Sequence, residues 1–117
     1  MKKENWQQLY DDVADNQDFN MIDFLHPCGT AACLLGHVAT LMIPSTESQD
    51  EEELLKKREK LIRTGDQEMA DWLGITLNQL PEFYVGSWAG KGISCITKED
   101  ALYWLNECLE KGEVTRI

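Results

Sequence analysis

The sequence predicts a mainly helical single domain, a compact bundle of about five helices with at most a short strand segment. Apolar residues recur at three- and four-residue spacing through most of the chain, which is the pattern of amphipathic helices. Glycine or proline stands where several of these stretches end. The chain of 117 residues is long enough to bury one modest core without a disulfide or a metal, so we expect residues 1–117 to form one domain.

The first predicted helix covers NWQQLYDDVAD, residues 5–15. Its apolar residues recur at i, i+3, i+4 and i+7, so they would face the core and leave the aspartates outside. These apolar residues are Trp6, Leu9, Tyr10 and Val13. The next stretch, FNMIDFL at residues 19–25, fits both a turn of helix and a short extended segment, and the pattern leaves the two alternatives open.

Residues 30–43 are predicted to form the most buried helix. This stretch is apolar nearly all round and contains several small residues, which is typical of a central helix that its neighbours approach closely. Thr30 is the expected N-cap, and Pro44 would end the helix. We expect Cys33 and Gly36 to pack against neighbouring elements.

Two further helices are predicted between residues 48 and 74. Ser48 and Glu51 have the spacing of a capping box at the start of the first, and Gly65 stands where its C-terminal cap belongs. The second lies within DQEMADWLGI and ends at Gly74. The first helix should bury Leu54, Leu55, Leu61 and Ile62 and form exposed ion pairs between Glu52 and Lys56 and between Glu53 and Lys57.

The glycine-rich stretch at residues 85–97 interrupts the helical pattern, and any ligand-binding loop is expected here. Within it, residues 93–96 have the composition of a short strand or an extended segment. Thr97 and Asp100 begin a last helix with a second capping box, and Gly112 would end it. Its expected buried residues are Ala101, Leu102, Leu105, Cys108 and Leu109.

The chain is strongly acidic, with 11 Lys and Arg against 21 Asp and Glu and a net charge of −10. This charge disfavours direct binding to nucleic acid or to an anionic membrane. Residues 4–55 contain no Lys or Arg. We therefore expect an acidic face that binds a basic surface of another protein, with solubility as the simpler explanation. The residues of this face are Asp11, Asp12, Asp15 and Asp18.

The N-terminal stretch MKKENWQQLY lacks the apolar segment of a secretion signal, and no window approaches 18 uncharged apolar residues. We expect a cytoplasmic protein without a membrane span. Its four cysteines, Cys28, Cys33, Cys95 and Cys108, should then be reduced. The oligomeric state cannot be inferred from the sequence.

The stretch HPCGTAACLLGHVATL, residues 26–41, offers a set of metal ligands. Two thiols and two imidazoles are a set that structural zinc accepts, and these residues are His26, Cys28, Cys33 and His37. Zinc fingers separate their ligand pairs by about a dozen residues, whereas here most of a helix lies between donors crowded into one short stretch. We expect no cofactor, with zinc as the alternative.

Cys28 also has the position of an activated thiol, just before a predicted helix. The segment CGTAACLL resembles the nucleophile segment of bacteriocin-processing cysteine peptidases, and papain-like peptidases also place their nucleophile before a helix. The resemblance implies a general base well downstream, but no histidine follows His37. A cysteine-dependent hydrolase is therefore the third hypothesis. We expect Cys28 to be structural, so that replacing it by Ser or Ala costs roughly 1–3 kcal/mol of stability.

A second ligand hypothesis is a sponge that sequesters a nucleotide-type signalling molecule. Backbone N–H groups at Gly29 and Thr30 could hold a phosphate at a helix start. Trp88 on its glycine-rich loop could cover a flat ligand, and Lys91 is the nearby cation. The loop GSWAGKG does not have the spacing of a P-loop.

Several stretches taken together resemble a group of small, mostly uncharacterised bacteriophage and bacterial proteins. These are FNMIDFL, CGTAACLLGHVA, ADWLGI and ITKEDALYWLNECLEKGEV, centred on the pattern Cys-Gly-Thr-x-x-Cys-x-x-Gly. The group usually has an aromatic residue in place of His37. The resemblance implies a phage or mobile-element accessory protein, which would act in the host cytoplasm. Such a protein would bind and block a host defence or nucleic-acid-handling protein.

Overall fold

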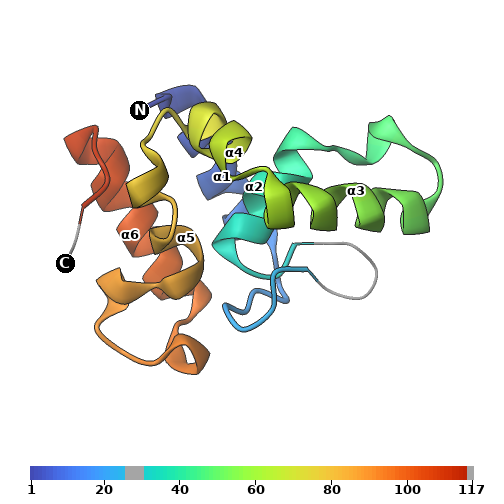
Figure 1. Ribbon diagram of the computed structural model, residues 1–117. Helices are drawn as coiled ribbons and strands as arrows, with labels where there is room; N and C mark the ends of the chain where they lie inside the picture. The colour runs from blue at the N-terminus through green and yellow to red at the C-terminus, as the bar shows by residue number, and fades with distance from the viewer. Residues whose placement is uncertain (26–30, 116–117) are drawn as a thin grey trace.

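The computed structural model describes residues 1–25 and 31–115, which contain six α-helices and four short 3-10 helices (Figure 1). The α-helices are α1 (Lys3–Asp15), α2 (Leu34–Met42), α3 (Glu51–Thr64), α4 (Asp66–Leu73), α5 (Glu82–Val85) and α6 (Lys98–Lys111). The 3-10 helices are η1 (Ser45–Glu47), η2 (Leu77–Gln79), η3 (Ser87–Ala89) and η4 (Ile93–Cys95). The predicted mainly helical fold is confirmed. Within these ranges the only β pairing is a single antiparallel bridge between Leu25 and Ala31.

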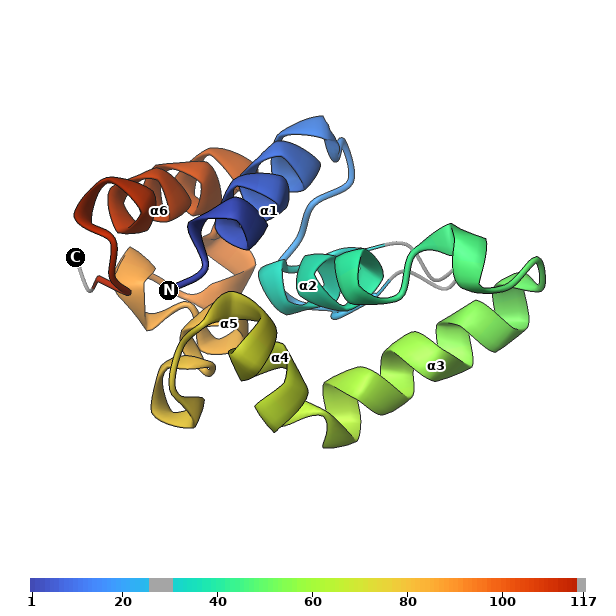
Figure 2. The same cartoon turned by 90° about the horizontal axis from the view of Figure 1, so that it is seen from above.

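The helices pack in a row in which α2 occupies the middle. Figure 2 shows α1 and α6 side by side, with α2 next to α1 and α3 on the far side of α2. Helix α4 connects α3 to the other helices, because it packs against α1, α2 and α3. Helix α3 therefore contacts the molecule through α2 and α4, and most of its surface faces solvent.

An aromatic cluster forms the centre of the core between α1, α5, η3 and α6. Trp104 packs edge-on against Phe83 at 5.3 Å between ring centroids and stacks on Trp88 at 4.9 Å. Trp6 completes the cluster from α1, 5.3 Å from Phe83. Each of the three indole N–H groups donates to a backbone carbonyl, that of Leu73, Glu82 or Thr115, so none is buried without an acceptor.

The sequence pattern located α1, α4 and α6 correctly. Trp6, Leu9 and Val13 of α1 are fully buried, and Tyr10 is half-buried.

Helices α4 and α6 end at Gly74 and Gly112, both with positive φ, as a C-terminal glycine cap requires. The predicted capping box of α6 is present, with the Thr97 hydroxyl accepting from the Asp100 N–H and the Asp100 carboxylate accepting from the Thr97 N–H. In α6 the buried residues are Ala101, Trp104, Leu105 and Cys108. Trp104 was not predicted, and Leu102 and Leu109, which were predicted, are half-buried.

The start of α2 differs from the prediction. The helix begins at Leu34, and its N-cap is Cys33, whose sulfur accepts from the Gly36 N–H. The sequence places the N-cap earlier, at Thr30, which lies outside the described residues. The preceding backbone is held by the segment at residues 20–25, since the Ala32 N–H donates to the Phe24 carbonyl at 3.1 Å and Ala32 accepts from the Asn20 N–H at 2.9 Å. Backbone paired in this way is not free to begin a helix. The predicted burial is confirmed, because Leu34–Ala39 are all buried.

Two other predictions are corrected, and the structure decides between the two alternatives for residues 19–25. Helix α3 is capped by Asp50, whose carboxylate accepts from the Glu52 N–H, while the Ser48 hydroxyl accepts from the Asp50 N–H before the helix begins. Residues 93–95 form the 3-10 helix η4, so no strand forms there, and Ile96 after it is extended. The segment at residues 19–25 is not helical, because the Asn20 side chain accepts from the N–H groups of residues 22 and 23 and so competes with helical hydrogen bonds.

Helix α3 buries less of its predicted apolar face than expected. Leu54 is buried, whereas Leu55, Leu61 and Ile62 are half-buried, and the buried polar residue Arg58 lies on the same helix. The predicted exposed ion pairs are confirmed, with Glu52 and Lys56 3.7 Å apart and Glu53 and Lys57 3.4 Å apart.

We predict that Gly36→Ala destabilises the fold. A Cβ atom at this position would lie 1.9 Å from the Phe24 carbonyl oxygen, which already accepts from the Ala32 N–H. Overpacking against a backbone group held in this way should cost about 3 kcal/mol or more. Urea unfolding measures the change. Gly92→Ala is the matched control, because nothing lies within 4 Å of a Cβ there and its φ of −61° suits alanine. Equal midpoints for the two variants would contradict the close contact.

Candidate functional site

A cleft of about 430 Å³ opens where α1, α2, η1 and α3 meet. It brings carboxylates from α1, the histidine of α2 and the buried arginine of α3 to one place. The residues that line it are Asp12, Asp15, Asn16, Ala31, His37, Thr40, Leu41, Pro44, Ser45 and Arg58. This cleft brings a buried histidine, a buried arginine and carboxylates together at one place, and it is therefore the candidate site.

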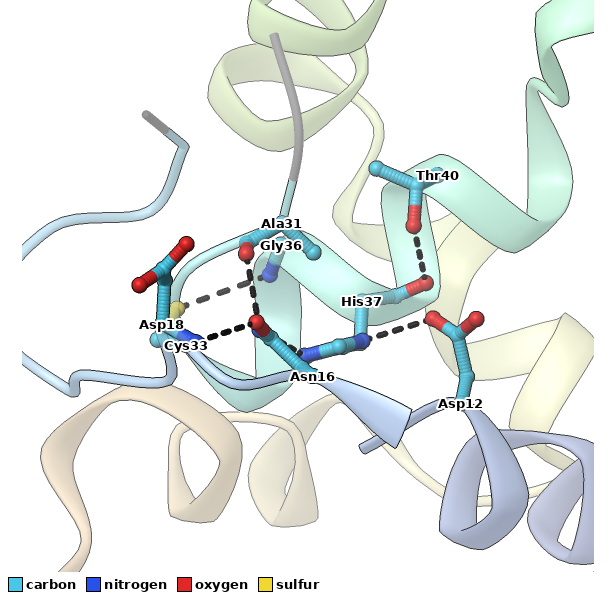
Figure 3. A network of polar contacts seen from close by, with 8 residues as sticks. All are labelled: Asp12, Asn16, Asp18, Ala31, Cys33, Gly36, His37 and Thr40. Carbon is cyan, nitrogen blue, oxygen red and sulfur yellow. Dashed lines mark hydrogen bonds and ion pairs between the residues drawn. The ribbon is translucent and has the colours of Figure 1, made fainter. Parts of the chain in front are cut away.

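His37 is the centre of the polar contacts in the cleft (Figure 3). Only 2% of the residue is exposed, and its ring lies along the ring of Phe19 at 6.1 Å. Nδ1 lies 2.6 Å from Oδ2 of Asp12, and Nε2 lies 3.0 Å from the amide nitrogen of Asn16. An amide nitrogen only donates, so Nε2 accepts and the ring proton is on Nδ1. His37 thus donates from Nδ1 to the Asp12 carboxylate.

Asn16 connects this histidine to the backbone on both sides of it. Its amide nitrogen donates to Nε2 of His37 and, at 3.0 Å, to the carbonyl of Ala31. Its oxygen accepts from the Asp18 N–H at 2.8 Å. Every polar atom of the Asn16 side chain is therefore engaged. These contacts fasten the C-terminal end of α1 to the chain just before α2.

Arg58 supplies a buried positive charge at the other side of the cleft. Its Nε donates to the carbonyl of Ile43 at 3.0 Å, which fastens α3 to the end of α2. Burial lowers the pKa of the guanidinium, and the negative charge of Asp12 acts in the opposite direction. The carboxylate of Asp12 therefore accepts a hydrogen bond from His37 and also favours the charged form of Arg58.

This arrangement holds helices together, and it engages the imidazole that could otherwise act on a substrate. An aspartate paired with Nδ1 of a histidine is the arrangement that orients a general base, but a general base needs its second nitrogen free. In His37 that nitrogen is occupied by Asn16. Burial also raises the pKa of the Cys33 thiol to about 11, so this thiol stays protonated at neutral pH and is a poor nucleophile.

In the part of the chain that the structure describes, no set of metal ligands forms around His37 and Cys33. His37 uses both ring nitrogens for Asp12 and Asn16, and the sulfur of Cys33 faces the Gly36 N–H at 3.5 Å. Residues 1–25 and 31–115 contain no group of three or more His, Cys, Asp or Glu placed to hold a metal ion. His26 and Cys28 lie outside the described residues, so zinc binding by the full set and the structural role of Cys28 stay predictions.

Of the residues expected to bind a nucleotide-type ligand, the two that the structure describes are engaged in other contacts. Trp88 does not lie over a ligand, because it is 2% exposed, stacks on Trp104 and donates to the Glu82 carbonyl. A large apolar ring is more stable in this core position than on a solvated loop. Nζ of Lys91 lies 2.6 Å from Asp100 and lowers the pKa of that carboxyl group. Gly29 and Thr30 lie outside the described residues.

The predicted acidic face is present in part. Asp11 and Asp15 are exposed on α1, and Asp18 is exposed just after it. Asp12 is not directed freely into solvent, because it accepts from His37. Lys98 reaches the end of the helix, where its Nζ donates to the Ala14 carbonyl at 3.1 Å. Asp12 and Asn16 are four residues apart and so share a helix face, which is the one signal in the sequence that separates Asp12 from the exposed aspartates. No sequence pattern placed that face against His37.

Comparison with protein-family models, with curated proteins and with solved structures found no match. Over the described residues, the structure contains no helix with the length and apolar character needed to cross a membrane.

We predict that Asn16→Ala destabilises the protein by about 2 kcal/mol, because it leaves Nε2 of His37 and the Ala31 carbonyl buried without a donor. Chemical unfolding measures the loss. Asn106→Ala is the matched control, since Asn106 is exposed on α6 and makes only a 3.4 Å contact with Glu110, and it should stay within about 0.5 kcal/mol of wild type. Equal effects of the two changes would show that the buried network contributes nothing.

A second prediction concerns the thiols. Cys33 and Cys108 are buried and burial raises the pKa of both, whereas Cys95 is exposed. A pKa near 11 instead of 9.0 lowers the thiolate fraction of Cys33 about a hundredfold at neutral pH, before steric protection is counted. Peptide mapping after iodoacetamide treatment should therefore find Cys95 modified and Cys33 and Cys108 protected. All three should react in concentrated urea. Rapid modification of Cys33 in the folded protein would contradict its placement.

Proposed function

We propose that this chain is a non-enzymatic protein-binding domain that occupies a basic surface of another protein with the acidic surface of α1. The observation that carries the proposal is an exposed stripe along that helix. Its members recur at i, i+4, i+7 and i+11 and are Glu4, Gln8, Asp11 and Asp15, with Asp18 just beyond the helix end. The buried residues lie on the opposite side of α1.

The charge of this stripe is not balanced in the way that the charge of α3 is. On α3, three glutamates each lie within 4 Å of a lysine or arginine one turn further along the helix. In the described part of the chain, Asp11 and Asp15 form no ion pair, and Asp11 only accepts from the Gln7 amide at 3.1 Å. The stripe therefore retains a negative potential that a basic groove would attract.

The cleft beside this surface supports a binding role over a catalytic one. Its histidine has both nitrogens engaged, its arginine holds a backbone carbonyl, and its polar groups fasten α1 against α2 and α3. A rigid α1 presents its aspartates without an ordering cost at the moment of binding. Asp12 belongs to this support, so we assign the contact surface to Asp11, Asp15 and Asp18.

The class of partner follows from the charge. A protein groove that normally holds DNA or RNA is lined with Lys and Arg and is complementary to an acidic helix. The resemblance of the central sequence motif to small phage and bacterial proteins adds a setting. In that setting the chain would be an accessory protein that blocks a host defence or nucleic-acid-handling protein by stoichiometric binding.

We predict that neutralising Asp11 and Asp15 together, as Asp11→Asn with Asp15→Asn, slows association with the partner about tenfold at low salt, because electrostatic steering is lost. Native mass spectrometry of protein from cells that express it identifies the partner, and stopped-flow kinetics over a salt series measures the rates. The doubly changed protein should also show a shallower salt dependence.

The matched control is Glu52→Gln with Glu53→Gln, which removes the same charge from α3, where both glutamates form ion pairs. This control should associate nearly as fast as wild type. Equal slowing by both pairs would mean that only net charge matters and would contradict a surface on α1. Asp12 is left unchanged in every variant, because replacing it would remove the carboxylate that accepts from Nδ1 of His37.

A further inference from the structure

Exposed apolar side chains lie on the segment that follows the acidic stripe and on α5 beside it. Ile22 is 63% exposed and Phe24 is 44% exposed. The ring of Phe24 contacts Tyr84 of α5 edge-on at 6.1 Å between centroids, and the next residue, Val85, is also exposed. We call Ile22, Phe24, Tyr84 and Val85 the apolar patch. The central residue, Phe24, thus packs against another aromatic ring. Aromatic residues are enriched among the energetically dominant contacts of protein interfaces.

A groove continues this patch toward α3. It has a volume of about 350 Å³, and its described lining is Asp23, Phe24, Leu25, Glu59, Ile62 and Arg63. Phe24 belongs to both the groove and the patch, so the two form one surface. The apolar side chains of the groove come from residues 24 and 25 and from Ile62, and charged side chains lie beside them.

The charges around this surface select its occupant. Asp23 lines the groove and is exposed. Glu59 adds a second carboxylate, and Arg63, the one cation in the described lining, lies 3.9 Å from Glu59. Carboxylates beside an apolar groove complement a helix that has an apolar stripe flanked by Lys or Arg. Charge steers such a partner, and apolar contact slows its dissociation.

We propose that the apolar patch and the adjoining groove bind a basic amphipathic helix of the partner protein, with Phe24 as the central contact. This inference rests on the proposed function, since it adds the affinity-determining contact to the acidic stripe of α1. The stripe governs how fast the partner arrives, and Phe24 with Ile22 governs how long it stays. The backbone position of Phe24 is fixed by its carbonyl contact with Ala32, so the side chain is presented from a rigid segment.

The experiment uses two fluorescein-labelled peptides of about 16 residues, both built from leucine and lysine. In one the leucines recur at i, i+3, i+4 and i+7, and in the other the same residues are scrambled so that no apolar stripe forms. Fluorescence anisotropy with the full chain gives the affinities at about 50 and 300 mM salt. We expect the amphipathic peptide to bind about tenfold or more tightly than the scrambled one.

Two variants test the contact itself. Phe24→Ala should weaken binding of the amphipathic peptide about tenfold through faster dissociation and leave the scrambled peptide unaffected. Ile22→Ser is the second variant, because a side chain exposed to this extent can be changed without loss of the fold. Tyr103→Ala is the matched control, since Tyr103 is 60% exposed on α6, and it should bind like wild type. Circular dichroism confirms that each variant is folded.

The outcomes separate this inference from the proposed function. Equal, salt-sensitive binding of both peptides would overturn the apolar contact and leave the acidic stripe supported. Binding of neither peptide at low salt would overturn both. If sedimentation shows a dimer of the chain that Phe24→Ala dissociates, the occupant is a second copy and the inference is wrong.

Discussion

A histidine buried in the middle of an apolar helix is the constraint on which the arrangement of this protein depends. Helix α2 is buried on all sides from Leu34 to Ala39, so the imidazole of His37 cannot be solvated by water. A buried polar ring destabilises the fold unless both nitrogens have partners. Asp12 and Asn16 provide them from the end of α1. The position of α1 against α2 is therefore fixed by a polar requirement as well as by apolar packing.

The same helix fixes the segment that carries the exposed apolar residues. Gly36 has no side chain, and this allows the Phe24 carbonyl to approach α2 more closely than any Cβ would permit. That carbonyl accepts from Ala32, and Asn16 holds Ala31 next to it. A loop of this kind would ordinarily be mobile, but here its backbone bonds are made to the core. Its outward side chains, Ile22 and Phe24, consequently occupy defined positions on the surface.

The sequence predicted the elements whose signals are local. Helix α6 could be located to the residue because Thr97, Asp100 and Gly112 act on backbone groups within one turn of themselves. The start of α2 could not, because the N–H of Ala32 bonds to Phe24, a pairing between two segments that no periodicity records. Trp88 shows the same limit. Glycines on both sides indicated an exposed loop, yet the ring is buried because Trp104, sixteen residues later, offers a stacking face.

The candidate site illustrates this difference most clearly. The composition showed that α1 is acidic. It did not show which aspartate contacts the protein interior and which aspartates face solvent. Asp12 and Asp11 are neighbours in the chain, and they differ because a helix turns about 100° per residue and directs one toward His37 and the other to solvent. Distinguishing Asp12 from its exposed neighbour therefore required the position of a histidine twenty-five residues away.

The placement of the exposed aspartates is costly for the helix that carries them. Asp15 lies in the last turn of α1, where the helix dipole is negative, and no basic residue of the helix offsets it there. A carboxylate in this position costs about 0.3–1 kcal/mol, and the like charge of Asp11 one turn earlier adds about 0.2–0.5 kcal/mol. Solubility alone would be served as well by acids in the first turn, where they stabilise the helix. Lys98 relieves one terminal carbonyl from outside the helix and leaves both aspartates exposed. A local rule broken at the surface, without a gain in packing, is what a site shaped by an external partner would show.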